Sequence, residues 1–429
     1  MSRKDHPKRE SPPSGGWPEA ASGLFDDNAE MKTPLKGYPR ADGRKGIRNV
    51  LVVAYLVECA HHVAREIAAA GRDRGVQLIG FPGCYPNAYA LAMMEKLCTH
   101  PNVGGALLVS LGCEGFDRRR LARTIEASGR PLRMLSIQEV GGTRKTIAAG
   151  REWIDATLPG LATQATVPMG IDELTVGTIC GGSDATSGLT ANPAMGVAFD
   201  LLIADGAKAI FEETGELIGM EHLMAARAAT PALGEELKRS VAKAARYYAT
   251  LGYASFAPGN ADGGLTTIEE KSLGAYAKSG QSRIDGIVKP GIPPPAKGLY
   301  LLDVVPDGEV RYGFPNINDN AEIAELIACG AHVILFSTGR GSVVGSAIAP
   351  VIKVCANPET WARMEDDMDV DAGRILEGRA TLPEVGREIH ALVQRVGNGE
   401  PTKSEALGHQ EFILTYKHFE PLGPACLPL

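Results

Sequence analysis

At 429 residues, the chain is longer than a single hydrophobic core usually organises, so we expect two domains. Its 44 Lys and Arg against 51 Asp and Glu leave a net charge of -7, which gives no support to a nucleic-acid or anionic-membrane surface. No apolar run approaches the roughly 18 residues of a membrane span, and the polar start has no signal-peptide core. The composition therefore indicates a cytoplasmic protein that binds a small molecule, with neither nucleic acid nor membrane as a partner.

The chain begins with a segment that lacks periodicity. Residues 1–33 are rich in Pro, Gly, Ser and charged residues, which predicts a disordered tail. Beyond it, four short apolar runs alternate with amphipathic stretches: VLVVAYLV, VQLIGF, VGGALLVSLG and LRMLSI. Four strand–helix units in a row predict a parallel sheet covered by helices, so residues 34–165 are expected to form an N-terminal, Rossmann-like α/β domain. Ligands of such sheets gather beyond the carboxyl ends of the strands.

The stretch 157–172, TLPGLATQATVPMGID, is predicted to be a linker to a second domain. Further apolar runs follow it, namely LTVGTI, AKAIFEE, GLYLLDVV, HVILFST and PVIKVCA. Helical stretches such as 234–249 and 382–396 lie among them. Residues 166–429 are therefore predicted to form a larger C-terminal α/β domain, which makes the whole chain an α/β protein of two domains.

The eight cysteines are too sparse for a disulfide scaffold, so their positions matter more than their number. Cys59, Cys84 and Cys113 each follow a predicted strand of the N-terminal domain, and Cys180 follows the first strand of the next domain. Helix N-termini at such turns favour the thiolate form. Three convergent thiolates would suit an iron–sulfur cluster with one open iron, whereas Fe2+ would prefer added histidine or carboxylate ligands. The predicted iron ligands are Cys59, Cys84 and Cys113; the alternative is that each is a small packing residue.

Histidine and carboxylate groups offer further ligands or bases. His62 lies in a histidine pair just after Cys59, where it would act as a base or ligand, or else cap the helix or face solvent. The stretch FEETGELIGMEHLM contains several carboxylates, among them Glu213 and Glu216. This stretch would either hold a hard metal ion or solvate a helix face.

The loop CGGSDATSGLTANPAMG, residues 180–196, is rich in small polar residues. Its first glycines let the backbone approach a ligand, and its hydroxyl and acidic side chains can bind several substrate hydroxyls or acid oxygens. The loop is therefore predicted to face a polyol-like ligand. The side chains assigned to that role are Ser183, Asp184, Thr186 and Ser187.

A second glycine-rich loop is predicted to supply the chemistry. In GNADGGLTTIEEKSLG, it brings Thr266 and Thr267 to the start of a helix that carries Glu270 and Lys271. A desolvated Lys271 would abstract a proton, with Glu270 beside it, whereas the alternative is a charged, solvated helix face. The groups predicted to be catalytic are Lys271, Glu270 and His62.

Two arginine-containing stretches are predicted to bind the acid group of the substrate. In FSTGRGSVVGS, glycines turn the chain tightly around Arg340, whose planar fork together with Ser342 suits a carboxylate or a sulfonate. The glycines alone are weak support, because no lysine follows them as in a P-loop. The turn GYPRADGRKGIRN contributes Arg48, either as a basic rim for an anionic substrate or as part of a surface turn.

These motifs together resemble the altronate/galactarate dehydratase family. The resemblance rests on GYPRADGRKGIRN, SLGCEG, IQEVGGTRKTI, CGGSDATSGLTANPAMG, PGNADGGLTTIEEKSLGAYAKSG, FSTGRGSVVGSAIAPVIKV and MEDDMDVDAG, in order between about Gly37 and Phe419. It implies an iron-dependent lyase of carbohydrate metabolism, with the iron as Fe2+ or as an iron–sulfur cluster. Such a lyase removes water from an altronate- or galactarate-like sugar acid to give a 2-keto-3-deoxy acid.

The resemblance also concerns subunit organisation and alternative activities. Many members carry a small N-terminal SAF domain that this chain does not show, so we expect a large subunit that works with a separate SAF-domain subunit, in an oligomer. The related (2R)-sulfolactate sulfo-lyase, which releases sulfite, is the alternative activity. A non-catalytic sugar-acid-binding subunit is the alternative of another class. GFPGCYPNAYA supports it, because members tend to have a histidine a few residues before this Gly-Cys pair.

Overall fold

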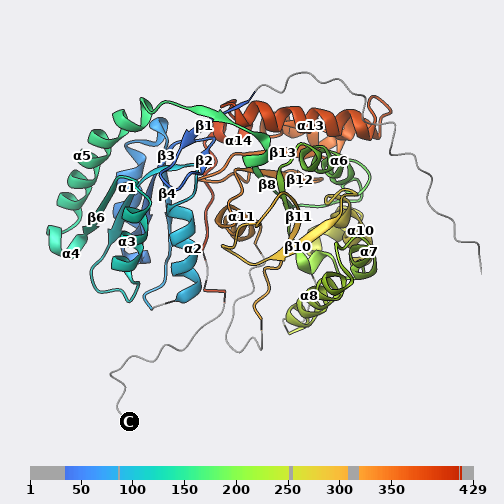
Figure 1. The fold of residues 1–429 in the computed structure, drawn as a ribbon, viewed down its shortest axis with the longest axis horizontal. Helices are drawn as coiled ribbons and strands as arrows, with labels where there is room; N and C mark the ends of the chain where they lie inside the picture. The colour runs from blue at the N-terminus through green and yellow to red at the C-terminus, as the bar shows by residue number, and fades with distance from the viewer. Residues whose placement is uncertain (1–33, 86, 251–254, 308–317, 415, 418–429) are drawn as a thin grey trace, which may run out of the picture. The chain divides into compact units, whose positions relative to one another are not determined.

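Two parallel sheets with covering helices confirm the predicted α/β class (Figure 1). The computed structural model describes residues 34–85, 87–250, 255–307, 318–414 and 416–417. Pro34–Leu429 forms one compact unit. The predicted tail, residues 1–33, lies outside the described residues, so its disorder stays a prediction.

The first sheet has the strand order β4-β3-β5-β6 and is parallel throughout. Its strands are β3 (Val50–Tyr55), β4 (Val76–Gly80), β5 (Val103–Ser110) and β6 (Leu132–Ser136). Its helices are α1 (Glu58–Ala69), α2 (Ala88–Cys98), α3 (Arg118–Ala127), α4 (Ile137–Val140) and α5 (Thr143–Ala162). Every residue of β5 is buried, which explains why its sequence is a continuous apolar run and does not alternate. The four predicted strands are therefore confirmed.

The predicted linker is shorter in the structure. Helix α5 continues through Pro159 to Ala162, past the predicted helix end, because only its last turn contains the proline. The segment after it forms β7 (Val167–Met169), which pairs antiparallel with β1 (Leu35–Pro39). With β2 (Lys45–Gly46), these strands make a small sheet of order β2-β1-β7 that the sequence did not predict.

The second sheet has the order β10-β11-β9-β8-β12-β13-β14, again parallel. Its strands are β8 (Thr175–Cys180), β9 (Lys208–Phe211), β10 (Ile284–Val288), β11 (Gly298–Leu302), β12 (Val333–Thr338), β13 (Val351–Cys355) and β14 (Val370–Asp371). The five predicted strands correspond to β8, β9, β11, β12 and β13. The central strand β8 has β9 on one side and β12 on the other, so the strand order reverses at β8. Ligands of open α/β sheets bind at such a switch point, beyond the carboxyl ends of the strands.

Helices cover both faces of the second sheet. They are α6 (Ala191–Ala204), α7 (Glu221–Ala226), α8 (Pro231–Ala249), α9 (Pro258–Asp262), α10 (Ile268–Ala277), α11 (Asp319–Ala328), α12 (Pro358–Met364), α13 (Leu382–Gly397) and α14 (Lys403–Leu407). Strand β8 shows the two faces directly: Val176 packs into a cluster with residues of α6 and α13, whereas Ile179 packs with residues of α11. Because β8 is buried on both faces, a ligand would reach it at an end of the strand, and in open α/β sheets that is the carboxyl end. No helix in the described part of the chain is long and apolar enough to cross a lipid bilayer.

Candidate active site at the carboxyl end of β8

A cavity of about 840 Å³ opens where β8 ends. Cys180, the last residue of β8, lines it. The loops after β9 and β12 contribute Glu213 and Arg340, while α10 contributes Lys271 and the start of α11 contributes Asp319. A smaller cavity of about 170 Å³ adjoins it and shares Cys180 and Lys271 in its lining. The topological switch point therefore coincides with a cavity lined by titratable side chains, which is the usual appearance of an active site.

A buried thiol and two carboxylates form the centre of the larger cavity. The Sγ of Cys180 lies 3.2 Å from Glu213 Oε1 and 3.3 Å from Glu216 Oε2, and it accepts a hydrogen bond from Ser183 Oγ at 3.2 Å. The Cys180 backbone N–H also donates to Glu213 Oε2 at 3.1 Å. Burial and the charge of Glu216 raise the pKa of Cys180, so the thiol keeps its proton and can donate it to a carboxylate.

Two buried lysines balance the two carboxylates. Lys271 pairs with Glu216, and Lys278 pairs with Glu213. Lys271 Nζ also donates to the Ser255 carbonyl at 3.0 Å. Burial acts to lower the pKa of Lys271, but Glu216 and Cys180 outweigh it and the pKa is raised. Lys271 is therefore an ammonium ion in this arrangement, and the two pairs together carry no net charge.

The backbone at Glu213 is strained in a way that serves this cluster. Glu213 directly follows the buried Glu212 after β9 and has φ 79°, in the left-handed region that residues other than glycine rarely adopt. This conformation turns the Glu213 carboxylate toward both the Cys180 backbone N–H and Lys278. Strain of this kind persists where the surrounding contacts fix it, and it gathers at functional sites.

Asp319 supplies a carboxyl group of a different character. It is the first residue of α11, and burial together with the nearby Glu216 raises its pKa to about 6. Gly181 allows the close approach, because a Cβ at that position would collide with the Asp319 carboxylate. The cavity thus holds an acid group that exchanges its proton near neutral pH beside carboxylates that are held by lysines.

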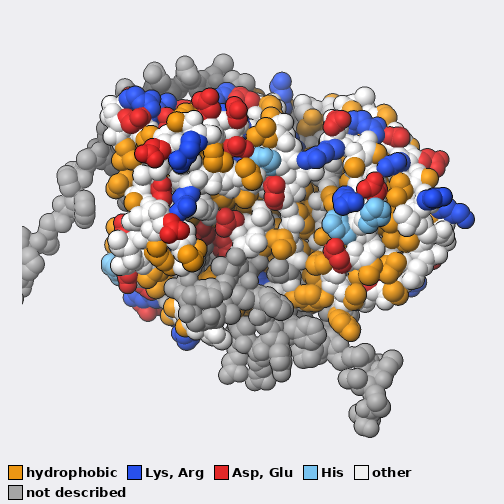
Figure 2. Space-filling model, turned by 180° about the vertical axis from the view of Figure 1, so that it is seen from behind, with side chains coloured by type: hydrophobic (Ala, Val, Ile, Leu, Met, Phe, Trp, Pro, Cys, Tyr) orange, Lys and Arg blue, Asp and Glu red, His pale blue; other side chains and the backbone are white. Residues whose placement is uncertain are grey.

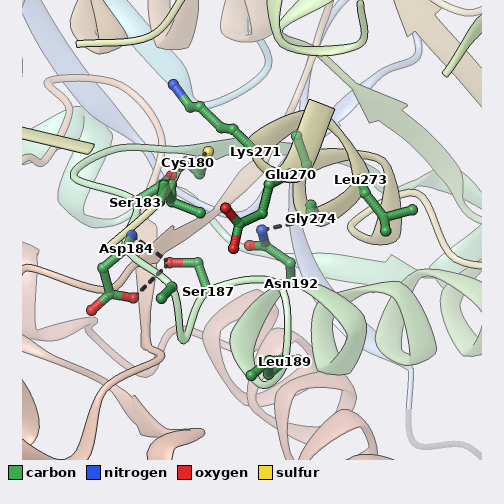
Figure 3. Close-up of a pocket in the computed structure, with 14 residues that line it drawn as sticks. Cys180, Ser183, Asp184, Ser187, Leu189, Asn192, Glu270, Lys271, Leu273 and Gly274 are labelled. Atoms are coloured by element: carbon green, nitrogen blue, oxygen red, sulfur yellow. Dashed lines mark hydrogen bonds between the residues drawn. The ribbon is translucent and has the colours of Figure 1, made fainter. Parts of the chain in front are cut away.

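The polar side chains of the loop after β8 form most of their hydrogen bonds within the loop. Asp184 accepts hydrogen bonds from the Thr186 backbone N–H at 2.9 Å, from Thr186 Oγ1 at 2.6 Å and from Ser187 Oγ at 3.2 Å. Its other oxygen accepts from Asn357 Nδ2 at 2.9 Å. Figure 3 shows Asp184 and Ser187 turned toward each other at the smaller cavity. Asp184 therefore closes the loop, and within the larger cavity the loop presents Ser183 and backbone.

The helix α10 directs its two predicted catalytic residues to different places. In Figure 3, the side chains of Glu270 and Lys271 leave α10 in different directions. Glu270 accepts hydrogen bonds from Thr266 through the backbone N–H at 2.8 Å and through Oγ1 at 2.7 Å, which lower its pKa. Thr267 caps the helix by accepting from the Glu270 backbone N–H. The exposed threonines thus organise the start of α10, and neither lines the two cavities.

The predicted arginines have different positions. Arg340 lines the larger cavity, where its Nη1 donates to the Gly259 carbonyl at 2.7 Å. Ser342, near Arg340, accepts from the Val344 backbone N–H and lines neither cavity. Arg48 is engaged elsewhere: its Nε and Nη2 donate to the Glu405 carboxylate at 2.7 and 2.8 Å.

The residues predicted on the first sheet do not reach these cavities. His62 is exposed on α1 and lies 3.3 Å from Arg65 Nη2. Cys59, Cys84 and Cys113 are exposed, unpaired thiols that follow β3, β4 and β5, as the sequence placed them. None of the four lines either cavity, so their catalytic and iron-binding roles stay predictions.

One group in the described part of the chain has the spacing of a metal site. Ligand atoms of Cys180, Glu213 and Glu216 all lie within 4.8 Å of one another, and all three residues are buried. The sequence placed Cys180 at a strand end and marked the two carboxylates as candidate metal ligands, but it did not join them. Lys278 and Asp319 were missed altogether, because neither has a local motif.

The described surface in Figure 2 shows no further binding site that stands out beside the cavities. On the face drawn in Figure 2, acidic and basic side chains are interspersed over the part that is described. A basic patch of the kind that binds nucleic acid does not stand out there, in keeping with the net charge of the chain. The functional question therefore concerns the cavities.

Comparisons with known proteins agree with this focus. Residues 171–419 match the description D-galactarate/Altronate dehydratase, C-terminal, and residues 37–162 match D-galactarate dehydratase/Altronate hydrolase, second domain. The (2R)-sulfolactate sulfo-lyase subunit beta of Chromohalobacter salexigens is 34% identical over 88% of this chain and 96% of its own length. The altronate dehydratase of Escherichia coli is 30% identical over 88% of this chain and 76% of its own length. The galactarate dehydratase (L-threo-forming) of Escherichia coli is 32% identical over 85% of this chain and 73% of its own length.

Proposed function

Because this chain belongs to the D-galactarate/altronate dehydratase family, we propose that it is a lyase that eliminates water from a sugar acid of the altronate or galactarate type. The product would be a 2-keto-3-deoxy acid. The observation that carries the proposal is the buried Lys271–Glu216 pair beside Cys180 in the lining of the larger cavity. Elimination from a hydroxy acid needs a cation for the carboxylate, a base and an acid within one cavity, and this cavity contains groups for all three roles.

The substrate carboxylate would bind to the cationic side of the cavity. Arg340 offers a planar guanidinium at the rim, and Lys271 offers an ammonium group inside. When a base removes the proton next to the carboxylate, negative charge spreads onto the carboxylate oxygens. The same two cations then stabilise the enolate-like transition state, which is why they belong to the reaction as well as to binding.

The proton acceptor would be a member of the Lys271–Glu216 pair. Lys271 was the acceptor predicted from the sequence, but its raised pKa keeps it protonated. This supports Glu216 as the basic member and Lys271 as the cation that holds it in place. The enol formed by elimination then becomes the 2-keto acid by taking a proton at carbon and releasing its hydroxyl proton.

The proton donor to the leaving hydroxyl would be Asp319. Its pKa of about 6 leaves a protonated fraction near neutral pH, and it lies in the same cavity as Glu216. Separate environments for two carboxyl groups allow one to act as an acid and the other as a base. The leaving hydroxyl departs as water once Asp319 has given it the proton.

Iron is the metal that the family resemblance implies. The donor types and spacing of Cys180, Glu213 and Glu216 fit a divalent ion, and these residues would hold it. Bound there, the metal would supply Lewis acidity toward substrate oxygens. Because both carboxylates are already paired with lysines, binding would require the Cys180 thiol to lose its proton and the lysines to move.

A second subunit belongs to the proposal as well. One relative is named as a beta subunit, and it aligns over 96% of its length. The two dehydratases of Escherichia coli extend beyond the aligned region, which covers 76% and 73% of them. We therefore include a small SAF-domain subunit as the partner of this chain, adjoining the cavity at β8.

The experiment is an anaerobic turnover assay with added Fe2+, with and without a co-expressed small subunit. Altronate, galactarate and (2R)-sulfolactate are supplied separately, while 2-oxo acid and sulfite are followed in parallel. We expect 2-oxo acid without sulfite from a sugar acid, and loss of that turnover in the Lys271→Met variant.

The other outcomes decide between the alternatives. Sulfite release from sulfolactate would establish the sulfo-lyase activity instead. Binding of a sugar acid by calorimetry without turnover, with either subunit composition, would establish a non-catalytic binding subunit. An active Lys271→Met variant would remove the assignment of the buried pair to the reaction.

A further inference from the structure

A third cavity, of about 520 Å³, lies at the β10 edge of the second sheet. One face of α8 lines it together with Lys289, which directly follows β10, and Asp303, which directly follows β11. In Figure 1, α8 lies on the β10 side of this sheet. None of the lining residues is shared with the two cavities at β8. This is therefore a separate cavity at the carboxyl ends of parallel strands, where α/β proteins bind ligands.

Two lysines and two aspartates form a cluster in the cavity wall. Lys243 Nζ donates to Asp303 Oδ2 and to Asp307 Oδ1, both at 2.7 Å. Lys289 Nζ donates to the same two oxygens, at 2.7 and 3.0 Å. The Asp303 side chain is 2% exposed and also accepts from Ser240 Oγ at 3.1 Å, whereas the Asp307 side chain is 76% exposed. Asp303 is thus a buried part of the wall, while Asp307 reaches the lysines from the surface.

Two guanidinium groups at the rim lack a close carboxylate. Arg239 and Arg246 lie four residues before and three residues after Lys243, so all three share one face of α8. Arg239 is exposed, and its Nη2 lies 4.0 Å from Glu236 Oε1. In the described part of the chain, the Arg246 side chain has no hydrogen-bond or ion-pair partner. The rim therefore offers two cations that a ligand can still pair with.

The charges of the lining indicate which ligand the cavity fits. Four side chains are cationic and three are anionic, which leaves one positive charge in excess. Hydrogen bonds from Lys243 and Lys289 lower the pKa of Asp307, so its carboxylate shows where an anionic oxygen is favoured. A ligand with a single carboxylate would gain nothing over Asp307, which is already tethered there. A dianion brings a second charge for the two arginines.

We propose that this cavity binds a small dianion, which takes the place of Asp307 between Lys243 and Lys289 and contacts Arg239 and Arg246. Phosphate monoesters and dicarboxylates share this double charge, and arginine forks suit both. A volume of about 520 Å³ is within the range of small-molecule sites, so it admits a metabolite. The proposal is independent of the elimination reaction, because the cavity shares no residue with those at β8.

The same helix contacts the candidate active site. A Cβ at Gly215 would collide with the ring of Tyr248 on α8, so helix and loop are in close contact there. Gly215 directly precedes Glu216, whose carboxylate pairs with Lys271. A ligand held by Arg239, Lys243 and Arg246 would therefore stabilise the helix against which the segment of Glu216 packs.

The test is isothermal titration calorimetry of the full-length chain at low ionic strength, with inorganic phosphate, succinate and acetate as probes. It is run at about pH 8, where phosphate is mostly a dianion. We expect a dianion to bind at least about tenfold more tightly than acetate and to slow hydrogen exchange in residues 231–249. Binding of phosphate but not succinate would identify a phosphate monoester as the ligand class, and the reverse would identify a dicarboxylate.

Variants of exposed residues separate this site from general charge effects. Arg246→Met should weaken binding about tenfold, because it removes an unpaired guanidinium. Asp307→Asn should tighten binding about tenfold, because it removes the internal competitor for the lysines. The matched control is Glu236→Gln, which removes the same charge from the lining but forms no bond to either lysine. It should tighten binding about threefold or less.

Several results would overturn the proposal. Equal tightening in Asp307→Asn and Glu236→Gln would show a general charge effect, and equal binding of acetate would remove the preference for a dianion. Unchanged affinity in Arg246→Met would exclude this rim. Binding that is lost in Arg340→Met, with protection confined to the loops at β8, would place the anion in the candidate active site instead. Far-UV circular dichroism checks the fold of each variant, and turnover is not a readout.

Discussion

Removing the ammonium group of Lys271 tests whether the charges at the end of β8 are balanced. The side chains of Lys271 and Glu216 are only 8% and 10% exposed, and Lys271 also donates to the Ser255 carbonyl. Breaking a buried pair by removing one partner costs about 3–5 kcal/mol, which includes the charge left behind. Methionine keeps the length of the side chain, so little cavity forms. We expect Lys271→Met to lower the free energy of unfolding by about 4 kcal/mol at about pH 8.

The dependence on pH gives this loss a signature. Burial opposes the charge of Lys271, but Glu216 raises its pKa above the ordinary 10.5. A lysine with a raised pKa stabilises the folded protein fully below about pH 10.5, and this contribution is lost as pH rises through the folded-state pKa. In the Lys271→Met variant, the orphaned Glu216 can take up a proton instead. The destabilisation should therefore be smaller at about pH 5 than at about pH 8.

Urea unfolding followed by circular dichroism measures both effects. The double variant Lys271→Met/Glu216→Gln removes both charges, so it should recover about half or more of the lost stability while turnover stays absent. Lys238→Met is the control, because Lys238 forms an exposed pair with Glu235 and its loss should change stability little. A double variant as unstable as Lys271→Met would refute the reasoning from charge balance.

Further predictions concern other groups of the site. Asp319→Asn should lower kcat about 10²–10⁴-fold and remove the fall of kcat/KM as pH rises through about 6, measured as a pH–rate profile. Arg340→Met should raise KM about tenfold or more with a smaller change in kcat, in steady-state kinetics. Gly181→Ala should lower the free energy of unfolding by about 1–3 kcal/mol, because the new Cβ would collide with the Asp319 carboxylate. Arg48→Met should lower stability without raising KM, since its guanidinium is engaged by Glu405; a raised KM would restore it to the substrate site.

The sequence predicted the buried strands and missed the marginal ones, for a physical reason. Strands covered on both faces, such as β5, have continuous apolar sequences that stand out. Strand β10 contains Asp285 and Gly286, has a register irregularity there and lies at the sheet edge, so its pattern is weak. Strands of two residues, such as β14, pair only because longer neighbours hold them in place. The local sequence pattern therefore predicts strands that are buried on both faces. Edge strands and very short strands depend on neighbours that are distant in the sequence, so the local pattern does not predict them.

The sequence predicted which loops form the candidate site, but it did not predict which side chains from distant elements contact them there. The Lys271 loop and the Arg340 loop were identified from glycine and charge, and both reach the larger cavity. Lys278 looks like an ordinary lysine at a helix end, and Asp319 looks like an ordinary acidic residue in a first helical turn. The roles of Lys278 and Asp319 depend on the order of the strands, which brings the ends of α10 and α11 to β8. Arg48 was predicted as a possible substrate-binding residue because the sequence of a basic turn does not reveal which carboxylate its arginine pairs with.

The polar loop after β8 limits what this chain can recognise by itself. Asp184 uses its oxygens within the loop and on Asn357. Asn192 is equally engaged, because it accepts from Ser337 Oγ at 2.6 Å and donates to the Gly274 carbonyl at 3.0 Å. A buried loop must satisfy its own polar groups, and most of the hydroxyl and amide groups here do so.

The larger cavity consequently presents more charged side chains than free hydroxyl and amide groups to a ligand. Its lining presents Lys271, Arg340 and Asp319 to a ligand, which suit an acid group and proton transfer. The additional hydroxyls of a sugar acid then need donors and acceptors from another source, and the proposed small subunit is where we expect them. Discrimination between a sugar acid and sulfolactate should therefore change with the small subunit more than with substitutions in the loop at 180–196, which makes its co-expression the decisive variable of the turnover assay.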